Sequence, residues 1–128
     1  MIDNKRVNGI YFFKEDDLGK RGKKMGRFVI VAYKPKPGKE QRLVKIVKKH
    51  IAILRVEKLV TSNSAYIMKA ADGTIVEVFE WLSAKAIERA HENPSVKALW
   101  EEFNDVCEYL PLTKVPETHQ MFAEFEAI

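Results

Sequence analysis

The order of apolar patterns along this 128-residue chain predicts an α+β fold of the β-α-β-β-α-β type. Three observations support this prediction. The apolar segment "RFVIVAY" precedes a long amphipathic segment, an Asp-Gly pair separates two strand-like segments, and a serine-capped helical segment precedes a final alternating segment. This is the ferredoxin-like plan, in which a four-stranded antiparallel sheet carries its helices on one face.

The first strand is expected at residues 27–33, and both of its alternate sets of side chains are apolar. Both faces of this strand are therefore expected to be buried. "KPKPG" predicts a turn, and a helix is expected from Lys39 to Lys58. Its apolar stripe consists of Leu43, Val47, His50, Ile51 and Leu54.

The segments "NSAYIMKA" and "TIVEVFEW" flank Asp72-Gly73, which is a strong signal for a β-hairpin. Ser83 is expected to cap the next helix, and Asn93-Pro94 to end that helix and start another. Apolar residues at helical spacing continue this last helix as far as Leu110. "HQMFAEFEA", residues 119–127, is expected to form the final strand.

Helices on one face leave the second face of the sheet without a cover. The apolar residues expected on that face include members of the hairpin and of the final strand: Met68, Val76, Val78, Met121 and Phe122. An apolar patch of this extent is unusual on a soluble monomer. We therefore expect a homodimer in which two sheets stack face to face.

Residues 1–26 are expected to be a charged N-terminal appendage, with a short strand or hydrophobic arm at "NGIYFF", and residues 27–128 the folded domain. The appendage holds seven basic and four acidic residues, so it carries +3 of the net charge of +4. The domain itself is nearly neutral, which argues against nucleic-acid binding because phosphate recognition needs a basic face. RNA binding on the sheet is also not expected, since the first strand offers "VIV" where exposed aromatic residues would be needed.

Several other classes of protein are excluded by composition. No apolar run reaches the length of a membrane span and no signal peptide is evident, so we expect a cytoplasmic protein without membrane attachment. The single cysteine, Cys107, cannot form an internal disulfide and is expected to be inert packing on a helical stripe. The three histidines lack metal-ligand spacing, so no metal site is expected.

Three segments carry a resemblance to a known family: "FVIVAYKPKPGKEQ", "DGTIVEVFEWLSAKAIERAH" and "NPSVKALW". They resemble the dimeric α/β barrel superfamily, and most closely its antibiotic-biosynthesis-monooxygenase-like domains. The family's tryptophan, serine, alanine and histidine pattern is met by Trp81, Ser83, Ala86 and His91. The resemblance covers roughly residues 27–126 and implies an α/β barrel formed by two subunits. Relatives include cofactor-free oxygenases acting on polycyclic phenols, haem-degrading enzymes and proteins with no assigned activity.

Haem degradation is not expected from this resemblance. Members of that branch pair an asparagine on the first strand with a tryptophan and a haem-ligating histidine on the second helix. Ala90 and Trp100 stand at the tryptophan and histidine places, and "RFVIVAY" has no asparagine. No cofactor is therefore expected.

Cofactor-free oxygenation requires an apolar cavity, a base for a phenolic proton and a polar group to stabilise the anion. The resemblance implies a cavity between the helices and the sheet of each subunit. The candidate bases are His50 and His91, and the candidate ligand-binding residues are His50, Tyr66, Glu77, Trp81, His91 and Trp100.

Each candidate also has a purely structural interpretation. His50 fits a core position, His91 fits the last turn of its helix, where a histidine stabilises free carbonyls, and Trp100 fits the core. Glu77 lies in the middle of an apolar strand, so its carboxylate must be paired, protonated or beside water; an ion pair at the dimer interface is one alternative.

Two functional hypotheses follow. The first is a dimeric α/β barrel protein that binds a small aromatic molecule, with cofactor-free monooxygenase-like activity as one form of it. The second is a non-catalytic homodimeric module for structure or interaction. The sequence leaves open whether the chain is an enzyme.

Overall fold

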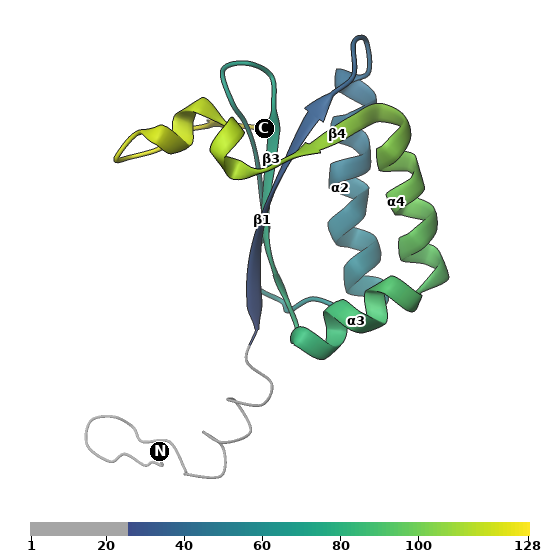
Figure 1. Cartoon of the computed structure of the whole chain (residues 1–128). Helices are drawn as coiled ribbons and strands as arrows, with labels where there is room; N and C mark the ends of the chain where they lie inside the picture. Colours follow the sequence, from purple (N-terminus) through teal and green to yellow (C-terminus); the bar gives the residue numbers. More distant parts are fainter. Residues whose placement is uncertain (1–25) are drawn as a thin grey trace, which may run out of the picture.

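The computed structural model describes residues 26–128, and the expected appendage at 1–26 lies outside these residues except for Gly26. The described chain is an α+β structure with one five-stranded antiparallel sheet. Its strands lie in the order β4 (Cys107–Leu110), β1 (Arg27–Pro35), β3 (Ile75–Trp81), β2 (Tyr66–Lys69) and β5 (Glu126–Ala127). Three helices lie on one side of the strands, and the C-terminal segment lies on the other (Figure 1). The prediction of an α+β fold is confirmed, and the strand order β4-β1-β3-β2 is compatible with the ferredoxin-like plan.

The first half of the fold follows the predicted pattern. Strand β1 spans Arg27–Pro35 and helix α2 spans Glu40–Val56. The buried positions of α2 recur every three or four residues, which is the spacing of one helical face. They are Leu43, Ile46, Val47, His50 and Leu54. This face packs against β1, β3 and α4, so α2 aims His50 into the interior.

The predicted hairpin joins β2, Tyr66–Lys69, to β3, Ile75–Trp81. Gly73 in its turn has a φ of 95°, a conformation that glycine adopts without steric cost, and the Asp72 carboxylate accepts a hydrogen bond from the Thr74 N–H at 2.9 Å. Strand β3 also pairs with β1, in a register that places Tyr33 opposite Ile75 and Val31 opposite Glu77.

Both predicted helix caps are present. Ser83 accepts a hydrogen bond from the Ala86 N–H at the start of α3, Ala84–Glu92. Asn93 accepts hydrogen bonds from Ser95 and Val96 at the start of α4, Pro94–Val106. Because Asn93 is extended and Pro94 follows it, the two helices form separate segments.

The end of the last helix was predicted wrongly. The helix ends at Val106, and Cys107–Leu110 form strand β4, which pairs antiparallel with β1. Cys107 and Leu110 fit helical spacing as well as they fit a short strand, and the open edge of β1 decides between the two. Cys107 is buried as predicted, but in a strand and not on a helical stripe.

The final strand was also predicted wrongly over most of its length. Leu112–Lys114 and Pro116–His119 are short 3-10 helices, η1 and η2, and only Glu126–Ala127 form a strand, β5. Since β4 occupies the edge next to β1, the C-terminal segment crosses the sheet and pairs with β2 at the opposite edge. Met121 and Phe122 lie between η2 and β5 and are exposed, not in a strand as expected.

The C-terminal segment covers one end of the second sheet face. Ala32, Ala70 and Val115 are buried together there, with Leu110, Leu112 and Phe125 packed around them. At the other end of the same face, Phe28 is 66% exposed, Ile30 49% and Tyr66 62%. We expected both faces of the first strand to be buried. On the second face of this strand, the single chain buries Ala32 and leaves Phe28 and Ile30 exposed.

No helix within residues 26–128 is both long enough and apolar enough to cross a bilayer.

Candidate functional site

A cavity of about 400 Å³ lies between the sheet and the helices. Strand β1 contributes Val29, Val31 and Tyr33, which alternate along the strand with the exposed Phe28 and Ile30. The other lining residues come from β3, α2, α4 and β4. The lining residues are Val29, Val31, Tyr33, His50, Phe79, Trp81, Trp100, Phe103, Asn104 and Tyr109. None of these ten carries a carboxylate, an ammonium or a guanidinium group, and six are aromatic residues other than histidine. Such a lining is typical of a site for a mostly apolar small molecule.

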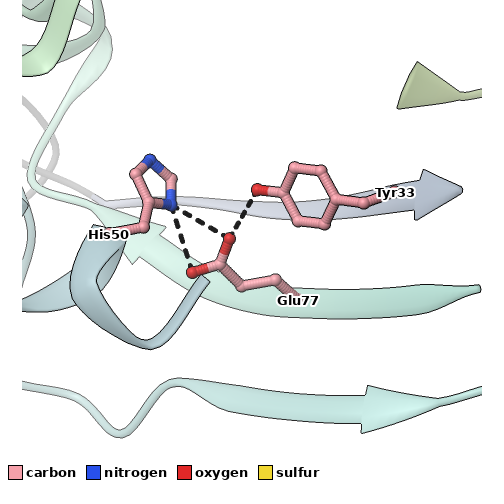
Figure 2. A network of polar contacts seen from close by, with 3 residues as sticks. All are labelled: Tyr33, His50 and Glu77. Atoms are coloured by element: carbon pink, nitrogen blue, oxygen red, sulfur yellow. Dashed lines mark hydrogen bonds and ion pairs between the residues drawn. The ribbon is translucent and has the colours of Figure 1, made fainter. Parts of the chain in front are cut away.

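A buried polar network adjoins this cavity. Glu77, from the middle of β3, is fully buried and accepts a hydrogen bond from the Tyr33 hydroxyl at 2.6 Å. His50 Nδ1 lies 3.0 Å from Oε1 and 3.2 Å from Oε2 of the same carboxylate. Figure 2 shows the Glu77 carboxylate between the two rings, with His50 from α2 on one side and Tyr33 from β1 on the other. Three elements of the fold therefore meet at one carboxylate.

The hydrogen bond to Glu77 determines which His50 nitrogen carries the proton. A carboxylate only accepts hydrogen bonds, so the neutral imidazole holds its proton at Nδ1 and has its lone pair at Nε2. Nε2 lies on the side of the ring away from Glu77 (Figure 2). It is buried, and no residue of the described part of the chain offers it a hydrogen-bond partner. A buried nitrogen of this kind is costly unless a partner reaches it, by about 1–3 kcal/mol.

Aromatic rings hold His50 in place. Phe79 and Phe103 meet the imidazole edge to face, at centroid distances of 5.5 and 5.3 Å. The Tyr33 ring stacks on Phe103 at 4.8 Å with an interplanar angle of 9°. These contacts restrict rotation of His50 and Tyr33, so the geometry at Glu77 is set by packing as well as by hydrogen bonds.

The environment of the cavity keeps its other ionisable groups neutral. Burial, followed by the charge of Glu77, raises the pKa of Tyr33 well above that of an ordinary tyrosine. Burial also raises the pKa of Tyr109 to about 12 and that of the adjoining Cys107 thiol to about 11. At neutral pH the two tyrosines therefore act as hydroxyl groups and the cysteine as a thiol.

The structure brings four of the six predicted ligand-binding residues to one place. His50, Trp81 and Trp100 line the cavity, and Glu77 bonds to two lining residues. Glu77 faces the helices, so its partners are His50 and Tyr33 and not a residue across a dimer interface.

The other two predicted residues lie elsewhere. Tyr66 is exposed on the second sheet face, where it is paired in register with Val78. His91 is exposed near the end of α3, with Nδ1 2.9 Å from the Ile87 carbonyl and its ring 5.1 Å from the Trp100 ring. This position matches the structural interpretation of His91, in which the ring stabilises the last turn of its helix.

Sequence reasoning missed Tyr33, Phe79, Phe103, Asn104 and Tyr109 as site residues. Tyr33 has a detectable signal, since it alternates with Val29 and Val31 and so shares their side of β1. Tyr109 has none, because its position in the site depends on β4, which was predicted as helix.

Among residues 26–128, no three His, Cys, Asp or Glu side chains gather as a group able to hold a metal ion.

In comparisons with known proteins, the chain matches no protein-family model and no curated protein.

Proposed function

We propose that this protein binds a small, uncharged aromatic molecule in the cavity between sheet and helices, and that His50 accepts a proton from it. One observation carries the proposal. His50 lines a cavity of about 400 Å³ and is 4% exposed, its Nδ1 is held by Glu77, and its Nε2 is a buried nitrogen with no hydrogen-bond partner among the described residues.

The cavity lining indicates the kind of ligand. Aromatic rings from four elements, including Phe79, Trp100 and Phe103, offer surfaces for a flat ring system. A carboxylate or phosphate on the ligand would enter a space to which residues 26–128 contribute no lysine or arginine side chain, and its desolvation would go uncompensated by them. A neutral hydroxyarene fits better, because its hydroxyl donates to the Nε2 lone pair.

His50 and Glu77 together form a base. A carboxylate that holds Nδ1–H orients the imidazole and stabilises the imidazolium formed when Nε2 takes a proton. Removing the phenolic proton leaves an electron-rich phenolate in an apolar environment. Asn104 and Tyr109 also line the cavity, and each carries a side-chain hydrogen-bond donor suited to an anion.

A cofactor-free monooxygenase-like reaction is the catalytic form of this proposal. A hydroxyarene that becomes a quinone takes up one dioxygen molecule and releases one water, so dioxygen is both the oxidant and the source of the added oxygen. The resemblance to the antibiotic-biosynthesis-monooxygenase-like domains supports this reaction, and the His50–Glu77 pair would supply its first step.

The proposal includes a homodimer. The exposed apolar end of the second sheet face, formed by Phe28, Ile30 and Tyr66, supports the stacking of two sheets. The C-terminal segment covers the Ala32 end of that face and so confines the contact to the remaining part. The strand order β4-β1-β3-β2, which is compatible with the ferredoxin-like plan, also supports an α/β barrel made from two such subunits.

A matched pair of probes tests ligand binding. 2-Naphthol should raise the thermal midpoint of the protein and quench the fluorescence of Trp81 and Trp100, the only tryptophans in the chain, both of which line the cavity. 2-Methoxynaphthalene keeps the rings but lacks the hydroxyl proton, so it should bind about tenfold more weakly. Equal binding of the two compounds would remove His50 as the acceptor.

The histidines provide matched variants. His50→Ala should weaken 2-naphthol binding about tenfold, whereas His91→Ala, at an exposed site outside the lining, should leave it unchanged. The proposed monooxygenase-like reaction is tested with an oxygen electrode. The unmodified protein should consume dioxygen with 2-naphthol or 1-naphthol, and His50→Ala should abolish this uptake.

A non-catalytic homodimeric module is the second candidate, supported by the exposure of Phe28 and Tyr66 and of Met121 and Phe122. A dimer that binds none of the phenolic and quinone-like compounds in a thermal-shift screen would favour it.

A further inference from the structure

Tyr33 does more than line the cavity. Its hydroxyl donates to Glu77 Oε1 at 2.6 Å, and His50 Nδ1 lies 3.0 Å from that same oxygen. Tyr33 is 2% exposed, and its ring is stacked on Phe103. The hydroxyl is therefore held where it and His50 share one carboxylate oxygen.

A hydrogen bond of this length to a carboxylate is charge-assisted and strong. It withdraws negative charge from Glu77 and so weakens the attraction of the carboxylate for a proton on His50. Burial and the charge of Glu77 raise the pKa of Tyr33, so its hydroxyl keeps its proton and acts as a donor across the neutral range.

We propose that Tyr33 is a positioning residue that acts through Glu77: by sharing the charge of the carboxylate, it weakens the attraction of Glu77 for a proton on His50, so that Nε2 accepts a hydrogen bond or a proton from the ligand. This inference rests on the proposed function of the cavity. It assigns Tyr33 a role distinct from that of the other cavity tyrosine, Tyr109.

The surroundings allow this role to be measured. Besides His50, α2 places the apolar Leu43, Ile46, Val47 and Leu54 on its buried face, and α4 contributes Trp100, Phe103 and Asn104 to the lining, none of which titrates. From β4, Tyr109 and Cys107 have pKa values raised to about 12 and about 11. Lys36 and Glu108 act on Cys107 through their charges, which have opposite effects on its pKa. Within the described part of the chain, the two tyrosines and the thiol near the His50–Glu77 pair therefore keep their protons across the neutral range.

The test is an NMR titration of protein labelled with ¹⁵N-histidine and free of ligand, with His50→Gln used to assign the His50 signals. Tyr33→Phe removes the donor and keeps the ring. The pH at which the His50 ring nitrogens take up a proton should then rise by about one pH unit. Tyr109→Phe is the matched control, because it removes a cavity hydroxyl that is not bonded to Glu77, and it should move this pH by less than about 0.2 unit. An unchanged midpoint in Tyr33→Phe would overturn the proposal.

Binding of 2-naphthol supplies a second readout. A proton on His50 Nε2 competes with the ligand hydroxyl, so Tyr33→Phe should weaken binding several-fold to about tenfold near pH 6.5, and the difference should shrink at pH 8.5. A purely structural role predicts an equal loss at both pH values, which would contradict the proposal. Failure of the unmodified protein to bind 2-naphthol would count against the proposed function alone, since the NMR titration needs no ligand.

A second variant covers the case in which Tyr33→Phe does not fold. 3-Fluorotyrosine placed at position 33 keeps the hydroxyl and makes it a stronger donor, so the His50 midpoint should fall. A midpoint that stays in place or rises would refute the role of Tyr33.

Discussion

Both carboxylate oxygens of Glu77 lie within 3.2 Å of His50 Nδ1, although the two residues are 27 positions apart in the chain. This contact joins the middle of β3 to the inner face of α2, at a point where both side chains are almost completely removed from water. It therefore contributes to the stability of the fold and fixes the position of His50 in the lining of the cavity.

Glu77→Leu should lower the free energy of unfolding by about 3 kcal/mol, because it leaves the Tyr33 hydroxyl and His50 Nδ1 buried without partners. Urea denaturation measures this loss. Glu102→Ala, which breaks only the exposed ion pair with Lys49, should cost less than about 1 kcal/mol. In the double variant Glu77→Leu/Tyr33→Phe, removal of the orphaned hydroxyl should restore about 1 kcal/mol; a further loss instead would contradict the network described.

The stability of the protein should fall as the pH rises from about 9 to about 11. Burial raises the pKa of Cys107 from its ordinary value of 9.0 to about 11, so above pH 9 the unfolded chain loses this proton while the folded chain retains it. The unfolded state then binds fewer protons, which makes the free energy of unfolding decrease as the pH rises through this range. Below pH 9 the contribution is fully present.

Urea denaturation at several pH values, compared with Cys107→Ala, isolates this effect. The variant should show a smaller decrease between pH 8.5 and pH 10.5, whatever its stability at neutral pH. Identical slopes for the two proteins would rule out the contribution of Cys107.

Asn93→Ala should destabilise the protein by about 2 kcal/mol. Asn93 caps α4 by accepting hydrogen bonds from Ser95 and Val96, and its amide also donates to Glu57 Oε1 at 2.8 Å, just after the end of α2. Ser83→Ala removes only the cap of α3 and should cost about 1 kcal/mol. Thermal unfolding of the two variants compares them directly, and equal losses would show that the contact with Glu57 contributes nothing.

Sedimentation should find a dimer that Phe28→Glu converts to a monomer. Phe28 is two-thirds exposed at the uncovered end of the second sheet face, so a carboxylate there would be buried unpaired between the two sheets. Val56→Glu is the control, because Val56 is even more exposed than Phe28 but ends α2 on the helical side, and it should leave the dimer intact. An unmodified protein that sediments as a monomer at micromolar concentration would contradict the stacking of two sheets.

Val31→Phe should abolish 2-naphthol binding without loss of stability. Val31 lines the cavity from β1, so the larger ring would occupy space that the ligand needs. Ile30→Phe adds a ring of the same size to the opposite face of the same strand and should leave binding unchanged. Fluorescence titration of both variants provides the measurement, and normal binding by Val31→Phe would place the ligand elsewhere.

Local patterns in the sequence determined much of the fold. Asp72-Gly73 predicts the hairpin, Ser83 and Asn93-Pro94 predict the helix caps, and the stripe containing His50 predicts α2, because each of these signals depends on neighbours in the chain. The same stripe indicated that His50 faces inward. The position of Glu77 in an apolar strand required a partner but did not identify it.

Only the tertiary structure decided the remainder. Cys107–Leu110 suit a helix and a strand equally, and pairing with β1 makes them β4, which brings Tyr109 to the cavity and sends the C-terminal segment to the opposite edge. Tyr33 and Glu77 are 44 positions apart, so their hydrogen bond depends on the register between β1 and β3 and on the packing of α2 above them. Periodicity describes which side of an element is buried, whereas the meeting of His50, Glu77 and Tyr33 is a property of three elements packed together.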